Sequence, residues 1–187
     1  MRDFVHHFYF DPVTKKLIDE AVAFNNQAHV LSRQGDYAGS ERLHLRALDI
    51  KLSAVGENDV TAVTRNELGE VYIKMGRIAD AEEQLRKAVS VRLRTGPAYD
   101  AAVSLENLGQ VYEAKGNFEE ARKVRRSHPG NIMVCGNNKC PGKTFHQSQL
   151  LACSGCKSAF YCGKACQAKD WRARHKKLCK AYTNTDH

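Results

Sequence analysis

The residues with the clearest chemical role are seven cysteines and one histidine near the C-terminus, which fall into four closely spaced pairs. Short separations between Cys and His side chains are typical of zinc sites, and two tetrahedral zinc ions need eight ligands. The first 134 residues contain no cysteine, so every cysteine of the chain belongs to this set. The spacing predicts two zinc ions held by the pairs Cys135 and Cys140, Cys153 and Cys156, Cys162 and Cys166, and His175 and Cys179.

All positions of these two sites are filled by protein side chains, which is typical of structural zinc, because a catalytic zinc keeps one position open for water. Disulfide bonds are the alternative use of clustered cysteines. Seven is an odd number, however, and disulfides are rare in reducing compartments. We therefore expect two structural Zn²⁺ ions as the cofactors.

The segment Met1–Asp11 is aromatic, but charged residues and histidines interrupt it, so it does not predict a signal peptide. No apolar run approaches the length of a membrane span. These features predict a soluble intracellular protein, in the cytoplasm, the nucleus or both, with no membrane partner.

The net charge of +8 is confined to the cysteine region. Residues 1–130 hold 19 Lys and Arg against 19 Asp and Glu, whereas residues 131–187 hold 10 against 2. Binding two Zn²⁺ through seven thiolates would lower the charge of the second part to about +5. A basic surface can bind nucleic acid. More often it is a solvated face around a metal site, and the sequence leaves both interpretations open.

Residues 20–127 contain an internal repeat of small and large side chains. Two copies align at an offset of 40 residues, and a looser copy lies 41 residues upstream of the middle one. Such periods are typical of arrays in which each repeat is one supersecondary unit. The aligned residues are Leu68, Gly69, Val71, Tyr72, Gly76 and Ala81 in the middle copy, Leu108, Gly109, Val111, Tyr112, Gly116 and Ala121 in the last, and Ala28, Leu31, Gly35 and Ser40 in the first.

This pattern resembles the tetratricopeptide repeat, and its long period is similar to that of kinesin light chains. The resemblance implies an all-α array of helical hairpins in residues 1–130. Glycine within a helix costs about 1 kcal/mol against alanine, which is tolerable where two helices approach closely. We therefore expect Gly69 and Gly109 to face Ala81 and Ala121 on the second helix of each hairpin. Three further glycines are expected to end the first helices, in the left-handed conformation that glycine favours: Gly35, Gly76 and Gly116.

The third repeat is expected to be short, because Pro129 and Gly130 follow soon after its second helix begins at Phe118. About three repeats are needed for a stable array. The sequence therefore suggests that either the cysteine region packs on the open end or a helix starting at Pro12 adds burial. The basic run 122–126 is expected to be exposed in a last helical turn, where it complements the helix dipole. A nucleic-acid-binding stripe is the alternative.

The cysteine region resembles the MYND-type zinc finger, which implies a small two-zinc unit in residues 131–187. Three residues carry the resemblance besides the ligands: Tyr161 before the fifth ligand, Gln167 after the sixth, and Trp171 between the sixth and seventh. The four-residue gap between the first two ligands is wider than usual for the family. The residues between the sixth and eighth ligands are expected to be helical, because key positions recur at i, i+4 and i+8.

In that family the two zinc sites interleave. Carried over to this chain, the first zinc takes Cys135, Cys140, Cys162 and Cys166, and the second takes Cys153, Cys156, His175 and Cys179. Metal must supply folding energy here, because so small a unit cannot bury a sufficient core. From spacing alone a sequential pairing stays open.

The family resemblance also implies binding of short peptides that contain proline and leucine, along an edge lined here by Ser154, Gln167 and Trp171. Gln167 and Trp171 lie four residues apart and so share one helical face. Tryptophan in so small a unit is also commonly a core residue. Trp171 is therefore either a peptide contact or a hydrophobic support for a zinc knuckle.

No enzymatic activity is expected. The chain has no Gly-rich phosphate-binding loop, and it lacks the further catalytic domain that some methyltransferases with this finger carry. The combined features predict a zinc-binding adaptor for protein–protein interactions that binds peptides through the finger and the repeat groove. The alternative is a DNA-associated transcriptional regulator or co-repressor that uses the basic finger.

Overall fold

The computed structural model describes residues 10–183, so residues 1–9 of the aromatic segment considered as a signal peptide lie outside it. The described part is mainly helical, with a small cysteine-rich region at its C-terminal end. None of the helices in residues 10–183 combines the length and the apolar character needed to cross a membrane.

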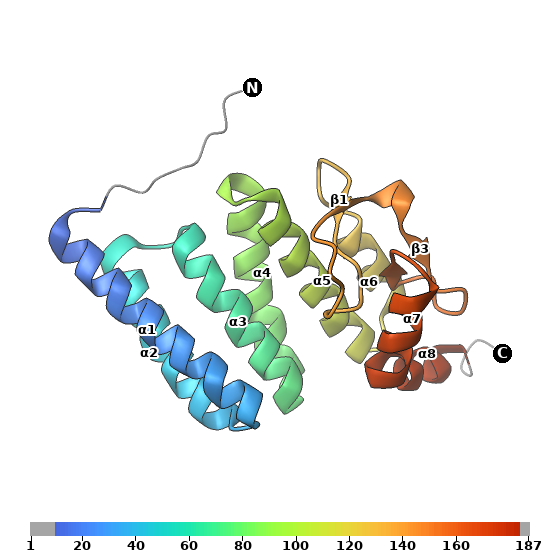
Figure 1. The fold of residues 1–187 in the computed structure, drawn as a ribbon, viewed down its shortest axis with the longest axis horizontal. Helices are drawn as coiled ribbons and strands as arrows, with labels where there is room; N and C mark the ends of the chain where they lie inside the picture. The colour runs from blue at the N-terminus through green and yellow to red at the C-terminus, as the bar shows by residue number, and fades with distance from the viewer. Residues whose placement is uncertain (1–9, 184–187) are drawn as a thin grey trace.

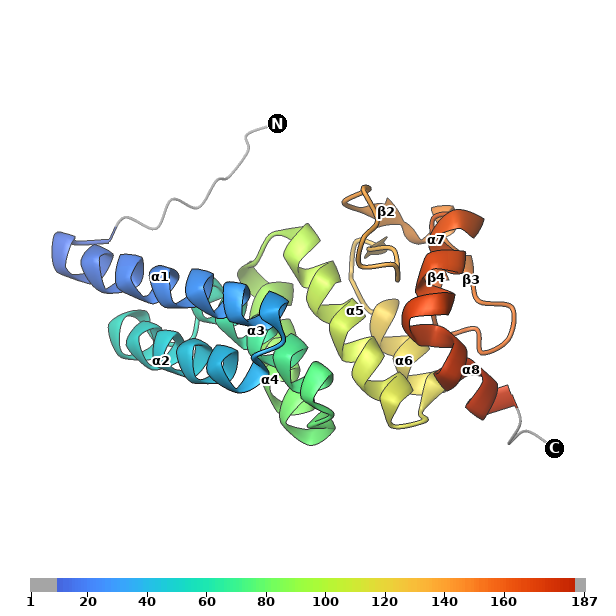
Figure 2. The same cartoon turned by 60° about the horizontal axis from the view of Figure 1, so that its bottom comes forward.

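Six helices form a row of three antiparallel hairpins, and the cysteine-rich region lies beyond the last of them (Figures 1 and 2). Each hairpin packs against the next, and the main buried cluster of the array draws residues from the second to the sixth helix. The fold is therefore the all-α repeat array that the sequence predicts. The helices are α1 (Pro12–Gln34), α2 (Tyr37–Val55), α3 (Asp59–Met75), α4 (Ile78–Thr95), α5 (Ala98–Ala114) and α6 (Phe118–Arg125).

Local sequence signals explain where these helices begin and end. Asp11 caps α1, because its side chain accepts hydrogen bonds from the backbone of Val13 and Thr14. Gly35 and Gly76 end α1 and α3 with φ values of 87° and 74°, in the left-handed region. The predicted cap glycines of the first two hairpins are thus confirmed, and Gly116, just past the end of α5, has a φ of 75°.

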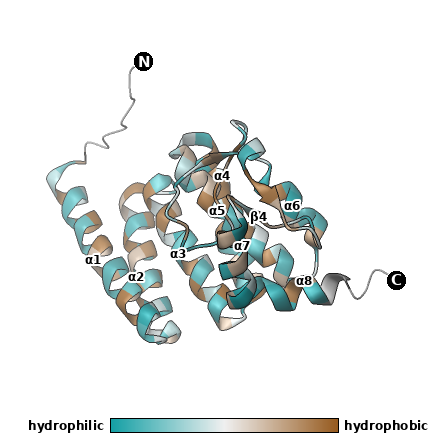
Figure 3. Ribbon diagram, turned by 45° about the vertical axis from the view of Figure 1, so that its right-hand side comes forward, coloured by the Kyte–Doolittle hydropathy of each residue, from teal (hydrophilic) through white to brown (hydrophobic). Residues whose placement is uncertain are grey.

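The core lies where the hairpins face one another. Figure 3 shows hydrophobic segments alternating with hydrophilic ones along the helices, as one buried face on each helix requires. The buried residues of the core come mostly from the positions that repeat in the sequence. They are Leu48, Leu68, Tyr72, Ala81, Leu85, Leu108, Val111, Tyr112 and Ala121.

Both mid-helix glycines lie at a close approach of two helices, as expected, but the residues that face them are not the expected Ala81 and Ala121. A methyl group at Gly69 would lie 2.4 Å from the side chain of Leu85, and one at Gly109 would lie 2.7 Å from that of Arg125. Leu85 and Arg125 lie one helical turn beyond the two alanines that we expected there. The helices do approach closely, but their relative register lets the larger side chain cover each glycine.

The end of the third repeat also differs from expectation. Arg125, in the basic run expected to be exposed, is only 2% exposed. Its guanidinium is ion-paired with two carboxylates of α5, Glu106 and Glu113. Neither is close to Arg125 in the sequence, so the sequence alone does not reveal these pairs. The sequence suggested two ways of stabilising the short array, and the structure has both. A helix, α1, begins at Pro12, and the cysteine-rich region packs on α5 and α6.

The cysteine-rich region contains two small antiparallel sheets and a broken helix. One strand of the first sheet packs against α5. The predicted helix between the sixth and eighth ligands is confirmed, with a π-helical turn in its middle. The elements are β1 (Ile132–Met133) paired with β2 (Phe145–His146), the 3-10 turn η1 (Gln147–Gln149), β3 (Leu151–Ala152) paired with β4 (Phe160–Tyr161), α7 (Lys164–Asp170), the π turn η2 (Trp171–His175) and α8 (Lys176–Thr183).

We expect Gly69→Ala to lower the free energy of unfolding by up to about 2 kcal/mol. The added methyl group overpacks the contact with Leu85, which costs about 1–3 kcal/mol, while the gain in helix propensity is about 1 kcal/mol. Thermal unfolding followed by circular dichroism measures the difference. Ser90→Ala is the control, because Ser90 is exposed on α4 and its change alters propensity alone. Equal or higher stability of Gly69→Ala would contradict the close approach.

Candidate metal centre

The first group of cysteines is assembled from three separate segments. Cys135 and Cys140 lie in the loop after β1, Cys162 follows β4, and Cys166 lies in α7. The Sγ atom of Cys162 is 3.6 Å from that of Cys140 and 3.5 Å from that of Cys166. All four sulfur atoms lie within 4.8 Å of one another.

The second group is fully buried and contains the histidine. Cys153 and Cys156 flank the turn after β3, His175 ends η2, and Cys179 lies in α8. The Sγ atoms of Cys153 and Cys179 are 3.8 Å apart, and the Nε2 atom of His175 is 3.3 Å from Cys156 Sγ. The structure thus brings the eight residues together in the interleaved quartets that the MYND resemblance implies, and not in sequential ones.

These distances fit tetrahedral zinc. Zinc–sulfur bonds of about 2.3 Å and zinc–nitrogen bonds of about 2.0 Å place two sulfur ligands about 3.8 Å apart, and a sulfur and a nitrogen about 3.5 Å apart. Burial disfavours the thiolate of Cys156, but contacts with His175 and Ser158 outweigh this effect and lower its pKa to about 6. A donor set of soft thiolates and one imidazole is suited to zinc.

Polar side chains around the first group were not identified from the sequence. The buried amide of Asn137 donates a hydrogen bond of 3.4 Å to Cys166 Sγ. The only feature of the sequence that could have indicated this role is the position of Asn137, two residues after the first ligand. Such outer hydrogen bonds orient metal ligands and tune their basicity.

Tyr161, singled out as part of the MYND pattern, supports the helix that carries the later ligands. It is 1% exposed, and its hydroxyl donates a 2.7 Å hydrogen bond to Asp170. Burial raises the pKa of Tyr161, and the neighbouring Asp170 carboxylate raises it further, so the phenol remains a donor. Asp170 in turn pairs with Arg174 at 2.9 Å.

A buried group of charges joins the finger to the repeat array. Arg125 Nε lies 2.7 Å from Glu106, Arg125 Nη1 lies 2.8 Å from Glu113, and Arg174 Nη1 also contacts Glu113. Two hydrogen bonds also cross the boundary. Arg125 Nη1 donates to the backbone carbonyl of Ser158, and Ser158 Oγ donates to Glu113. Burial alone would raise the pKa of Glu113, but Arg125 foremost holds it well below its usual value, so it stays ionised. Sequence reasoning missed this cluster, because its members are far apart in the chain.

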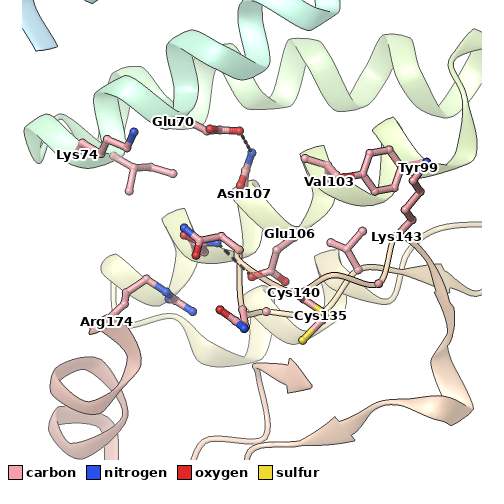
Figure 4. Close-up of a pocket in the computed structure, with 17 residues that line it drawn as sticks. Glu70, Lys74, Tyr99, Val103, Glu106, Asn107, Cys135, Cys140, Lys143 and Arg174 are labelled. Carbon is pink, nitrogen blue, oxygen red and sulfur yellow. Dashed lines mark hydrogen bonds between the residues drawn. The ribbon is translucent and has the colours of Figure 1, made fainter. Parts of the chain in front are cut away.

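A pocket of about 550 Å³ lies between the repeat array and the finger. Figure 4 shows Glu70 and Lys74 at one edge and Cys135 and Cys140 at the other, with a hydrogen bond of 2.8 Å from Asn107 to Glu70. The pocket therefore reaches the first metal group. Its lining residues are Glu70, Ile73, Lys74, Tyr99, Val103, Glu106, Asn107, Gln110, Val134, Cys135, Gly136, Asn137, Asn138, Cys140, Gly142, Lys143 and Arg174.

The three residues predicted to bind peptide lie elsewhere on the finger. Ser154 is exposed in the turn after β3, while Gln167 and Trp171 are partly buried on α7 and η2. None of them lines the pocket. Trp171 packs against the core of the finger, and its ring lies 6.0 Å from that of His175. Part of its surface is thus structural, as the alternative interpretation proposed.

The interleaved arrangement predicts which cysteines share a metal. We expect Cys140→Ser and Cys162→Ser each to disturb only the all-cysteine site, because both residues belong to the first quartet. After loading with Co²⁺, both variants should retain the same visible absorption of a site with three sulfurs and one nitrogen. Native mass spectrometry of the wild type should show two Zn²⁺. Different residual spectra for the two variants would indicate sequential pairing instead.

Two families match the chain in consecutive segments. The tetratricopeptide repeat family matches residues 19–94 and 61–124, which together make up more than half of the chain. The MYND finger family matches residues 133–179, which include all eight predicted ligands. A MYND finger binds zinc, and the two quartets are suited to two zinc ions.

Similar proteins share only parts of this arrangement. Ubiquitin carboxyl-terminal hydrolase 19 of Arabidopsis thaliana is 38% identical over 61 residues, which are 33% of this chain and 9% of that protein. Tetratricopeptide repeat protein 19 homolog, mitochondrial, of Drosophila melanogaster is 26% identical over 98 residues, 52% of this chain and 27% of that protein. The chain thus spans only a small part of the curated relatives that it matches.

Among solved structures, BtubC (BKLC) from P. vanneervenii is similar, with a TM-score of 0.52 and 23% identity over 59% of this chain and 48% of that one. At this identity the likeness concerns the fold alone. The matched segments, the helical hairpins and the two ligand quartets agree with one another. The chain belongs to the tetratricopeptide repeat family and carries a zinc-binding MYND finger after its repeats.

Proposed function

We propose that this protein is an adaptor in which the repeats, residues 1–130, and the finger, residues 131–187, each bind peptide segments of partner proteins. The observation that carries the proposal is the pocket between the two modules, because pockets at such junctions are common binding sites. Both modules are typically non-catalytic interaction modules. We accordingly propose no enzymatic activity for the chain and a location inside the cell.

The finger offers an open strand edge for a peptide. The sheet of β3 and β4 has only two strands in the described structure, so β3 keeps one free edge. Leu151 on β3 is 61% exposed, and the exposed Ser154 follows three residues later. An extended peptide can add to such an edge through backbone hydrogen bonds, while side-chain contacts supply specificity. Leu151 was not among the residues that the sequence suggested.

The predicted peptide contacts have unused polar groups. Within residues 10–183, the side chains of Ser154 and Gln167 and the indole N–H of Trp171 make no hydrogen bond. Trp171 is partly exposed, so its buried face can support the core while its other face contacts a ligand. This combination supports a short peptide with proline and leucine as the ligand of the finger.

The pocket supports a second peptide contact, on the repeat array. The side-chain amide of Asn107 donates to Glu70 and to Asn66, which leaves its oxygen available to accept from a peptide N–H. Tyr99 is 44% exposed at the rim and offers apolar surface. A few polar groups in a partly apolar cavity are typical of a site that binds a specific ligand.

The structure gives less support to nucleic acid as the partner. Arg125, in the basic run 122–126, is buried, and Arg174 of the finger is paired with Glu113 and Asp170. Phosphate contacts make binding fall steeply as salt rises. The salt dependence of binding therefore separates the two functions.

We expect Trp171→Ala to weaken the binding of short synthetic Pro/Leu peptides by about 2 kcal/mol, because aromatic anchors dominate small interfaces. Binding should shift the emission of Trp171, which is the only tryptophan of the chain. Ser154→Ala and Gln167→Ala should weaken binding to a smaller degree.

Lys169→Ala is the matched control, because Lys169 is exposed on α7 and lies away from the face of Gln167 and Trp171. The Trp171 variant must retain two zinc ions for the comparison to hold. The assignment is wrong if Ser154→Ala and Gln167→Ala bind as the wild type does. Affinity that instead falls by orders of magnitude between about 50 and 200 mM salt, with DNA as ligand, supports the regulatory alternative.

For the pocket, we expect peptides selected from a random library against the whole chain to include a group that loses binding in Tyr99→Ala but not in Trp171→Ala. The exposed ring of Tyr99 lines the pocket and Trp171 does not, so the two variants separate the two surfaces. Calorimetry measures the affinities. Leu45→Ala is the control, because Leu45 on α2 is also 44% exposed but lies outside the pocket. If no selected peptide depends on Tyr99, the pocket is not a peptide site.

A further inference from the structure

Glu113 is the residue through which the repeat array reaches the second metal site. It lies near the end of α5, and its side chain is fully buried. Both of its oxygens bond to the finger: Oε1 accepts from Ser158 Oγ at 2.8 Å, and Oε2 accepts from Arg174. The same Oε2 lies 3.8 Å from Nδ1 of His175.

His175 has one ring nitrogen on each side of this junction. Nε2 faces Cys156 Sγ at 3.3 Å and belongs to the ligand quartet. Nδ1 is buried and has no hydrogen-bond partner within residues 10–183. A histidine that binds metal usually directs its second nitrogen toward a carboxylate or a carbonyl, which sets its orientation and its basicity. The carboxylate next to Nδ1 belongs to Glu113, in the other module.

We infer that Glu113 is a positioning residue for His175, so that metal binding at the second site and docking of the finger on α5 and α6 are one coupled equilibrium. Zinc at this site orients the imidazole toward Glu113, and the docked array in turn supplies the carboxylate that the imidazole needs. Coupling between two sites is reciprocal. The repeat array therefore strengthens metal binding at the second site, and the metal strengthens the docking.

The surrounding contacts make this junction sensitive to the loss of either partner. Undocking would take Arg174 and Ser158 away from Glu113 and the Ser158 carbonyl away from Arg125, so three hydrogen bonds across the boundary are lost together. Phe118 of α6 packs in the same buried cluster as Cys153 and Cys179. Because Arg174 also lines the pocket, the same equilibrium sets one of its walls.

The first metal site provides an internal comparison. Its ligands lie partly at the surface, and the side chain that hydrogen-bonds to it, Asn137, belongs to the finger itself. A change at Glu113 should therefore act on the site that contains His175 and spare the all-cysteine site.

The test is Glu113→Gln in the whole chain loaded with zinc. We expect the affinity for one of the two zinc ions, measured by competition with a chelator, to fall about 10- to 100-fold, as for other outer-sphere partners. The affinity for the other zinc ion should be unchanged. Cobalt substitution identifies the weakened site by its mixed sulfur–nitrogen spectrum. Glu119→Gln is the matched control, because it removes an equal charge from the exposed surface of α6. Equal affinities of both sites in Glu113→Gln and wild type would overturn the inference.

Hydrogen exchange of the wild type tests the reverse direction and does not depend on whether Glu113→Gln folds. Removal of zinc should reduce the protection of α5 and α6 and leave α1 and α2 unchanged. The variant His175→Cys tests the imidazole apart from the metal. It replaces the imidazole ligand with a thiolate, so the protein should still bind two zinc ions but should lose the added protection of α5. Undiminished protection of α5 after zinc removal, or full protection in His175→Cys, would show that Glu113 acts only within the repeat array.

Discussion

The burial of Arg125 between Glu106 and Glu113 is the interaction on which the arrangement of the two modules depends. A guanidinium that is removed from water must be paired and fully hydrogen-bonded. Arg125 meets this requirement with two carboxylates from α5 and one carbonyl from the finger, so it is satisfied only when the finger is docked. Gly109 provides the space, because a side chain there would collide with the guanidinium.

The two modules also complement each other in stability. The array has three hairpins, and its last helix, α6, has only eight residues, so its end exposes apolar surface unless something covers it. The finger is too small to bury a sufficient core of its own and depends on metal for folding. Phe118 packs into the same cluster as several zinc ligands, so the contact covers the end of the array and extends the core of the finger.

This docking also creates the surfaces from which a function can be argued. The pocket exists because α3 and α5 form one wall and the first zinc knuckle and Arg174 form the other. The free edge of β3 and the partly exposed Trp171 lie on the finger outside this pocket. A single chain thus presents two separate candidate surfaces for polypeptides, and both depend on the metal that orders the finger.

The sequence by itself determined the local features: the eight zinc ligands, the helical hairpins, the caps at Gly35 and Gly76, and the helix that carries Gln167 and Trp171. Each rests on short-range spacing or on a periodic pattern, which few residues are enough to encode. Only the tertiary structure decided that Leu85 and Arg125 cover the two mid-helix glycines, that Arg125 is buried, and that Glu113 lies beside His175. These contacts join residues up to 62 positions apart. Their geometry depends on the register and angle at which whole elements pack, and no local pattern in the sequence specifies either.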